Sequence, residues 1–345
     1  MFSLNQVTDK SNEFEKIITT IDSHTEGEGT RLIVDGVGEI PGSTMMEKLG
    51  YFKTHFDHIR CLLTRAPRGG EILAAMVTDN VSPGAAFGLL YMDAKRYPYL
   101  CGHATIGAVI TLAKFGYLEL KEGKNTVGVD TPSGIMTLSA QVQEGTISSV
   151  AMDMVPSFVY ETDRKIAVEG FGELSIDLVC TGGFFAMVDT RQLGIAPVIE
   201  NKSVLVDLGM KIIDAANEQL KVVHPIRSDV TTVDVTEFYD SSDEIPATSG
   251  RGMVIYGESH MDYSPCGTGT AAKLALLHHY GKIALHQSYT NTSPLGTTFE
   301  ASLVGKTKIG DLDAFITRIQ GRAWVTGIHH FVIDKTDPFK QGFLV

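Results

Sequence analysis

The chain has little of what marks secreted, membrane-spanning or nucleic-acid-binding proteins. Its 345 residues include only four cysteines and one tryptophan, and the formal net charge is −12. No apolar run reaches the ~20 residues that span a bilayer, and the first residues lack the pattern of a signal peptide. An acidic chain is poorly suited to bind nucleic acid or an anionic membrane, because phosphate binding needs a basic patch. We therefore expect reduced thiols, a cytoplasmic location, and neither a nucleic-acid nor a membrane partner.

The composition is that of a globular enzyme with many strands and few helices. Hydrophobic residues make up 43% and charged residues 20% of the chain, which is long enough for two domains. Helices are expected at 43–58, 102–115, 202–219 and 267–280, and strands at 17–38 (two strands around a glycine-rich turn), 84–92, 127–131 and 135–142. The second and fourth helices are apolar almost all round, so they should be buried inside surrounding sheet. The pattern predicts an α+β fold.

An internal duplication is the most informative feature. Cys101 begins CGHATIGAVITLAKFG and Cys266 begins CGTGTAAKLALLHHYG, which share Gly at +1, Thr at +4, an aromatic residue at +14 and Gly at +15. A similar proline turn follows each copy, at 131–134 and at 293–296. We predict two related lobes that face each other across a shared cleft. The expected boundaries are 1–152 plus 327–345 for the lobe with Cys101, and 153–326 for the lobe with Cys266.

A cysteine placed just before a helix has a chemical use. The first turn offers unpaired N–H groups and the positive end of the helix dipole, which stabilise a thiolate and should lower the cysteine pKa. The same N–H groups bind a carboxylate, and glycine after each cysteine lets a ligand approach the backbone. Two thiols on opposite sides of one carbon suit an enzyme that removes a proton from one face and returns one to the other.

Other interpretations of these side chains are simpler. Cys61 and Cys180 are expected to be buried as small apolar residues. A disulfide between Cys101 and Cys266 is an alternative to two free thiols, although the setting disfavours it. The sequence has no C-x₂₋₄-C pair for zinc, and the His278–His279 pair suits a helix end rather than a metal site.

Several motifs together resemble those of the proline racemase family. That family comprises proline racemases, 4-hydroxyproline 2-epimerases and trans-3-hydroxyproline dehydratases. It has the diaminopimelate epimerase-like fold, with two pseudo-symmetric lobes that each wrap a mostly antiparallel sheet around a central buried helix. The resemblance covers nearly everything after about residue 17, and it rests on DSHTEGEGTR (22–31), RAPRGGEI (65–72), LCGHATIGA (100–108), TPSG (131–134), TGGFFAMVD (181–189), VIYGESHMD (254–262), SPCGTGT (264–270) and the closing segment 326–345.

The resemblance implies an isomerase that needs no cofactor and no metal and forms a homodimer. Cys101 and Cys266 would be the paired acid and base, and their pKa values should lie near the working pH. His103 and Asp262 would form hydrogen bonds in the site. On residue type alone, Asp262 is also a plausible turn former, and His103 a packed residue at a helix end. The dehydratase branch typically has Thr where this chain has Cys266, which disfavours that activity.

The same resemblance implies contacts to the substrate. Gly102, Gly267 and Thr268 would bind its carboxylate through backbone or hydroxyl groups. Leu73 and Tyr256 would line the pocket for the substrate ring, although Leu73 is also an ordinary core residue. The small-molecule substrate is expected to be proline or a hydroxyproline, with proline favoured.

The chain departs from the usual family pattern at four positions. Gly29 replaces Pro, Gly70 replaces His, Leu73 replaces an aromatic residue, and Tyr263 replaces Arg. These changes leave both thiols in place and bear on the choice of substrate. Two other classes compete with the isomerase: a cysteine hydrolase that pairs Cys101 with His103, and a non-catalytic amino-acid-binding protein. The hydrolase is disfavoured because residues two apart on a helix do not face each other.

Overall fold

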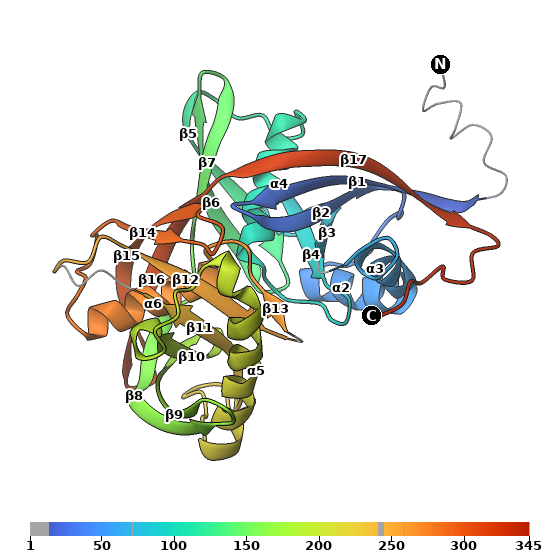
Figure 1. Cartoon of the computed structure of the whole chain (residues 1–345). Helices are drawn as coiled ribbons and strands as arrows, with labels where there is room; N and C mark the ends of the chain where they lie inside the picture. The colour runs from blue at the N-terminus through green and yellow to red at the C-terminus, as the bar shows by residue number, and fades with distance from the viewer. Residues whose placement is uncertain (1–13, 71, 241–244, 258, 345) are drawn as a thin grey trace.

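The computed structural model describes residues 14–70, 72–240, 245–257 and 259–344. Within these ranges strands predominate around a few helices, so the predicted α+β class is confirmed (Figure 1). The helices are α2 (Met45–His55), α3 (Asp57–Thr64), α4 (Gly102–Lys114), α5 (Lys202–Gln219) and α6 (Gly267–His279). The strands are β1 (Phe14–Thr25), β2 (Glu28–Asp35), β3 (Leu73–Thr78), β4 (Phe87–Met92), β5 (Gly123–Thr131), β6 (Gly134–Gln143), β7 (Thr146–Asp153), β8 (Ser157–Val168), β9 (Gly172–Thr181), β10 (Gly183–Asp189), β11 (Val233–Tyr239), β12 (Ser249–Tyr256), β13 (His260–Met261), β14 (Tyr289–Thr292), β15 (Thr298–Ile309), β16 (Leu312–Gly321) and β17 (Ala323–Asp334).

The strands form two rings that repeat one pairing pattern. In the first ring the strand order is β17-β1-β2-β3-β4-β5-β6-β7, and each strand pairs with the next. The pairs β2–β3 and β4–β5 are parallel and the others are antiparallel. In the second ring the order is β8-β9-β10-β11-β12-β14-β15-β16, with β10–β11 and β12–β14 parallel. Parallel pairs therefore occur at the same two places in each ring, which is the topological counterpart of the duplicated sequence.

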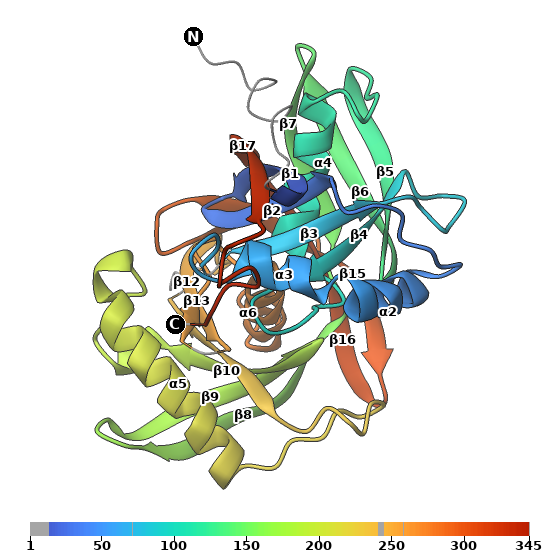
Figure 2. The same cartoon turned by 90° about the vertical axis from the view of Figure 1, so that its right-hand side faces the viewer.

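Each ring surrounds one apolar helix. Helix α4 contacts β1, β2, β3, β7 and β17, and α6 contacts β8, β9, β10, β12, β15 and β16. Figure 2 shows α6 enclosed by the second ring, while the longer α5 lies outside it. Both central helices are buried along nearly their whole length. A helix apolar on every side hides that surface best inside a curved sheet, so the sequence-based prediction of two wrapped helices is confirmed.

Strand β16 joins the two rings. It pairs with β8 and β15 of the second ring and, near its end, with β7 of the first, where Val150 lies opposite Gly321. The chain then passes through Arg322 into β17, which pairs with β1. We propose that the two rings are the two lobes, divided close to 1–152 plus 327–345 and 153–326, since β17 of the first ring begins at Ala323.

The central helices end in the same way. Gly116 and Gly281 follow α4 and α6 with φ of +76° and +69°, a left-handed conformation that glycine adopts without a Cβ clash. The expected helix over 43–58 is wrong in one respect. Two helices occupy this region, because the backbone at Phe56 (φ −128°, ψ 13°) ends α2 and starts α3. The apolar side chains of both helices are buried in a separate small core with β3 and β4.

Candidate active site

Cys101 and Cys266 occupy the same structural position in the two lobes. Each is the residue immediately before the first turn of the central helix, and its carbonyl accepts a hydrogen bond from the N–H four residues on: Thr105 to Cys101 at 3.0 Å and Thr270 to Cys266 at 2.9 Å. The helices begin at Gly102 and Gly267, as the duplication predicted. All four cysteines of the chain are free thiols, which rules out the disulfide alternative in this structure.

The two helix starts converge on one methionine. A Cβ added at Gly102 would lie 3.8 Å from Met154 Cε, and one added at Gly267 would lie 3.2 Å from the same atom. Met154 follows β7 at the crossing between the lobes, where its N–H donates to the carbonyl of Thr317 at 2.7 Å. Helices α4 and α6 of opposite lobes therefore approach each other at their first turns, with Met154 beside both.

The charge of one carboxylate acts on both thiols. Asp262 raises the pKa of both Cys101 and Cys266, in each case by less than burial does. The pKa of the Tyr256 hydroxyl is also raised, chiefly by burial. The charges of Asp262, Glu28 and both cysteines raise it further.

Cys101 lies beside an imidazole. Its Sγ is 3.3 Å from Nδ1 of His103. The expectation that residues two apart cannot face each other is wrong here, because Cys101 precedes the helix and has an extended backbone (φ −144°, ψ 114°). Burial lowers the pKa of His103, while the charge of Asp262 raises it. A buried, neutral imidazole beside the thiol can accept a proton from it or donate a hydrogen bond to its thiolate.

Cys266 is held by a tight turn instead. Its Sγ accepts a hydrogen bond from the N–H of Gly269 at 3.4 Å and lies 3.4 Å from the hydroxyl of Thr268. The backbone of Cys266 has φ of +54°, an uncommon conformation for a residue with a Cβ. Ser264 supports it, because the N–H of Cys266 donates to the Ser264 hydroxyl at 3.1 Å.

Burial of the thiols reverses one expectation from the sequence. The pKa of Cys101 is raised to about 12, and that of Cys266 is raised well above its usual value, in both cases chiefly by burial. Backbone N–H groups of the first helical turn lower each pKa, as predicted, but by less than the loss of water raises it. The prediction that the helix start gives a low thiol pKa is therefore wrong for both cysteines.

Asp262 and its neighbours form a buried acidic cluster at the base of the site. The Asp262 Oδ1 atom accepts hydrogen bonds from the N–H (2.8 Å) and the hydroxyl (2.7 Å) of Ser264. Glu28 Oε2 accepts from the N–H of Tyr263 at 2.8 Å, and Glu28 Oε1 is 3.4 Å from Nε2 of His260. Burial, and next the charge of Glu28, raise the pKa of Asp262.

Sequence reasoning did not single out Glu28, His260 or Met154. Glu28 and His260 both lie inside quoted motifs, the glycine-rich turn after residue 22 and the segment before Asp262. An acid in a glycine-rich turn was the available signal for Glu28. Nothing local marks Met154, whose place depends on how the two lobes meet.

Leu73 and Tyr256, the two residues expected to line the ring pocket, lie on different elements, and of the two only Tyr256 is affected by the charges of both thiols. Leu73 begins β3 and Tyr256 ends β12, and both are half-buried against the core that also packs against Cys101. The Tyr256 ring packs edge-on against His260, with the ring centroids 4.9 Å apart.

The other three positions that depart from the family pattern differ in their surroundings. A Cβ added at Gly70 would meet nothing within 4 Å, and one at Gly29 would touch Ile72 at 3.4 Å. The Tyr263 hydroxyl accepts a hydrogen bond of 2.6 Å from Lys202, so its side chain points away from Glu28 toward α5.

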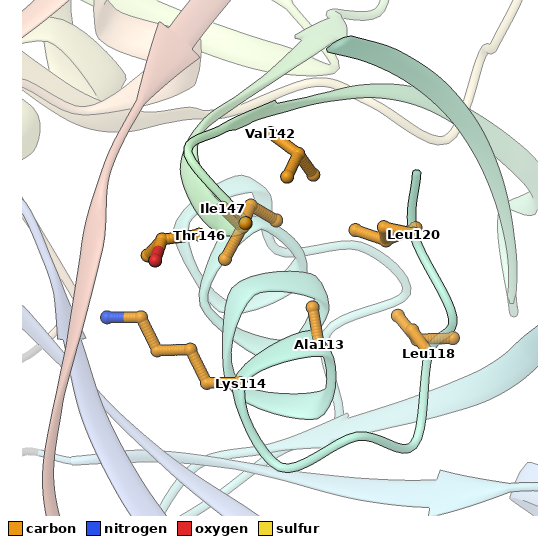
Figure 3. A pocket seen from close by; sticks show the side chains of 8 residues that line it. Ala113, Lys114, Leu118, Leu120, Val142, Thr146 and Ile147 are labelled. Atoms are coloured by element: carbon orange, nitrogen blue, oxygen red, sulfur yellow. The ribbon is translucent and has the colours of Figure 1, made fainter. Parts of the chain in front are cut away.

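A separate cavity lies at the other end of α4. Figure 3 shows it between the end of that helix and the β6–β7 turn. The cavity has a volume of about 230 Å³. Its lining is Ala113, Lys114, Leu118, Leu120, Val142, Gly145, Thr146 and Ile147. Because Cys101 precedes the opposite end of α4, this cavity is not part of the thiol site.

The described ranges of the chain contain no group of three or more His, Cys, Asp or Glu side chains arranged to hold a metal ion. No helix among them is long and apolar enough to cross a membrane.

Comparison with known proteins decides the family. The model of the family described as "Proline racemase" matches residues 20–344. The chain belongs to the proline racemase family. It is 36% identical over 334 residues to the proline racemase of Clostridioides difficile, covering 96% of this chain and 99% of that protein. It is 37% identical over 332 residues to the 4-hydroxyproline 2-epimerase of Streptosporangium roseum, again covering 96% and 99%.

Solved structures agree with this assignment. The structure of a hydroxyproline epimerase from Agrobacterium vitis, with bound trans-4-OH-L-proline, superposes with a TM-score of 0.84 at 31% identity and covers 97% of this chain and 96% of that one. A phenazine biosynthesis protein of the PhzF family from Bacillus anthracis shares only the fold, with a TM-score of 0.58 at 14% identity and coverage of 92% and 100%. The predicted membership of the proline racemase family, with its two-lobed fold, is thus confirmed.

Family membership also bears on the hydrolase alternative. The Cys101–His103 contact is real, but a hydrolase built on it leaves Cys266, in the matching position of the second lobe, without a role.

Proposed function

We propose that this protein is a proline racemase, which interconverts L- and D-proline by proton transfer between the α-carbon and two thiols. The observation that carries the proposal is the convergence of the helix starts after Cys101 and Cys266 on Met154, with both thiols under the charge of Asp262. Enzymes of this kind need an acid and a base on opposite faces of one carbon, and this site offers one thiol from each lobe.

The reaction balances with these groups alone. One cysteine, as thiolate, takes the α-proton, and the electron pair left on carbon is delocalised into the substrate carboxylate. The opposite cysteine, as thiol, then donates its proton to the other face of the carbon. The two sulfurs end with exchanged protonation states, so the reverse reaction uses them in reversed roles. No cofactor and no metal takes part in this scheme.

Helix starts suit the binding of the carboxylate. N–H groups at Gly102, Gly267 and Thr268, with the Thr268 hydroxyl, would bind the substrate carboxylate and stabilise the charge that develops on it. Glycine at the first position of each helix lets the ligand reach the backbone. Both helix dipoles favour an anion at this point.

Substrate binding also explains how a thiol with a raised pKa becomes a base. Proline carries a positive ring ammonium group, and Asp262 and His103 would bind it by hydrogen bonds. A cation beside buried thiols favours their charged form and so lowers their pKa values. Both thiols are therefore weak acids by themselves, and the bound substrate would supply the cation that makes one of them a base.

A second candidate is 4-hydroxyproline 2-epimerase activity. The polar pair of His260 and Glu28 borders Tyr256, which would line the ring pocket, and a ring hydroxyl could bond there. Leu73 favours proline, because a hydroxyl placed against it would lose its water without a new partner. Cys266 disfavours a dehydratase, whose branch typically has Thr at that position. We further propose that the protein is a homodimer and that it is located in the cytoplasm.

Incubation with L-proline in deuterated water tests the proposal. We expect incorporation of deuterium at the α-carbon, seen by NMR, together with loss of optical rotation. The matched control is the double variant Cys101→Ser/Cys266→Ser, which should do neither. Parallel reactions with trans-4-hydroxy-L-proline and trans-3-hydroxy-L-proline identify the preferred ring. Binding of these compounds without any exchange would instead identify an amino-acid-binding protein.

A further inference from the structure

The cores of the two lobes differ at one matched position. Seven residues after Cys101 lies Ala108, whereas seven residues after Cys266 lies Lys273. The Lys273 side chain is fully buried, and its Nζ is 3.6 Å from Oε1 of Glu237 on β11, which is also fully buried. A charged pair thus lies inside the second lobe where the first has a methyl group.

The pair is connected to the backbone beside Cys266. Lys273 Nζ donates hydrogen bonds of 2.8 Å to the carbonyl of Arg251 and to Oδ1 of Asn291. Asn291 in turn donates to the carbonyl of Pro265 at 3.0 Å and to the Thr270 hydroxyl at 2.7 Å. Pro265 directly precedes Cys266, so this network holds the turn that carries the thiol.

Two glycines leave room for the charges under the first turn of α6. A Cβ added at Gly269 would lie 2.8 Å from Glu237 Oε2, and one at Gly252 would lie 2.7 Å from Glu237 Oε1 and 3.0 Å from Lys273 Nζ. Gly269 is the residue whose N–H donates to the sulfur of Cys266. The Glu237 carboxylate and the Cys266 thiol therefore both contact the first turn of α6 at Gly269.

Stability alone does not account for such a pair. Burying two charges costs much of what their attraction returns, and apolar residues of similar volume often serve a core as well or better. The first lobe packs its corresponding layer with neutral groups, including the hydroxyls of Tyr91 and Thr105, 2.6 Å apart. The difference points to a role specific to Cys266.

We propose that the Glu237–Lys273 pair is a positioning element that holds the proton on Cys266 more firmly than the first lobe holds the proton on Cys101, so that Cys101 is the thiol that loses its proton first when the substrate binds. The assignment of acid and base rests on the proposed racemase function. The residues two places after each cysteine support this asymmetry, since His103 offers an imidazole to Cys101 and Thr268 only a hydroxyl to Cys266.

The charges around Glu237 agree with this role. The carboxylate of Glu237 raises the pKa of Cys266 in addition to burial and Asp262. Burial raises the pKa of Glu237 itself to about 7, against the opposing effect of Lys273, so the group is ionised above neutral pH. The other ionisable groups facing the pair are Asp262, Asp240, Tyr289 and Tyr239, whose ring centroid is 6.0 Å from Lys273 Nζ.

Thiol reactivity measured separately at the two cysteines tests the proposal. The protein is pulsed with iodoacetamide between pH 8 and 10, and alkylation at Cys101 and Cys266 is counted by mass spectrometry. In the unmodified chain we expect Cys101 to react faster. In Glu237→Gln, Cys266 should react about tenfold faster or more, since one unit in pKa is tenfold in thiolate, with Cys101 unchanged. Glu237→Asp, which keeps the charge, should restore the slow reaction.

Control variants separate this role from a general loss of packing. Tyr91→Phe removes a buried polar group from the first lobe and should leave Cys266 reactivity unchanged. If Glu237→Gln does not fold, Glu237→Gln/Lys273→Met removes both charges and should accelerate Cys266 in the same direction. Equal acceleration of both thiols, or none at Cys266, would overturn the inference. Absence of proline racemisation with the expected thiol asymmetry would instead overturn the proposed function alone.

Discussion

The backbone N–H of Tyr263 donates a hydrogen bond of 2.8 Å to Glu28, joining the turn between β1 and β2 to the segment that leads into Cys266. The same turn makes a second contact across the lobes, because the Thr297 hydroxyl donates to the carbonyl of Glu26. Glu28 also raises the pKa of Cys101 in the first lobe. The turn between β1 and β2 is therefore a hydrogen-bonded connection between the lobes, and the relative position of the two thiols depends on it.

Gly27→Ala should disturb this connection between the lobes. A Cβ at Gly27 would lie 2.7 Å from the carbonyl oxygen of Tyr263, and the residue has φ of +112°. We expect kcat for racemisation to fall about tenfold or more, because small errors in position are costly in catalysis. Gly38→Ala is the matched control, since its φ of +103° carries similar backbone strain with nothing within 4 Å of the added carbon. Equal kcat in the two variants would show that the contact with Tyr263 is unimportant.

Replacing either thiol should abolish racemisation without abolishing all chemistry. A serine hydroxyl is a far weaker acid than a thiol, so Cys101→Ser and Cys266→Ser each lose one face of the α-carbon. Each variant should still exchange the α-proton of one enantiomer with solvent, and the preferred enantiomer should switch between them. Deuterium NMR on L- and D-proline measures this. Cys180→Ser, a buried cysteine outside the site, is the control, and near-normal racemisation by Cys266→Ser contradicts the two-thiol mechanism.

The raised pKa of Cys101 predicts a loss of stability in alkali. The folded protein keeps this thiol protonated up to about pH 12, whereas the unfolded chain releases the proton near pH 9. The contribution of this thiol to the free energy of unfolding is therefore fully present below pH 9, and it is lost as the pH rises from 9 towards 12. At pH 10 the loss is about 1 kcal/mol. Thermal unfolding at pH 8 and pH 10 should show a smaller decrease in Tm for Cys101→Ala than for the unmodified chain.

Proline should be preferred over trans-4-hydroxyproline. A ring hydroxyl packed against Leu73 would lose hydration at a cost of about 1–3 kcal/mol, which corresponds to about a five- to 150-fold difference in kcat/KM. Racemisation and epimerisation rates measured on both substrates give this ratio. A ratio that favours trans-4-hydroxyproline would mean that His260 or Tyr256 binds the hydroxyl. Tyr256→Phe and His260→Phe would then show which of the two does so.

Local features of the sequence were sufficient to predict the repeated unit of the fold. The duplicated pattern located both central helices, their starts at Gly102 and Gly267 and their glycine ends at Gly116 and Gly281. Such features depend on residues within a few turns of one another, through helical periodicity and the backbone freedom of glycine. The break at Phe56 was missed because nothing in the apolar pattern of 43–58 interrupts a helix.

The family and the placement of Cys101 and Cys266 before the two central helices also followed from sequence, but the environment of the thiols did not. Only the folded chain brings Glu28 to Tyr263, sets Met154 between the helix starts, and buries Glu237 against Lys273. It also decides that burial outweighs the helix starts and raises both thiol pKa values. The physical reason is that desolvation and charge interactions depend on everything within a few ångströms. In this protein those neighbours come from both lobes, on segments far apart in the chain.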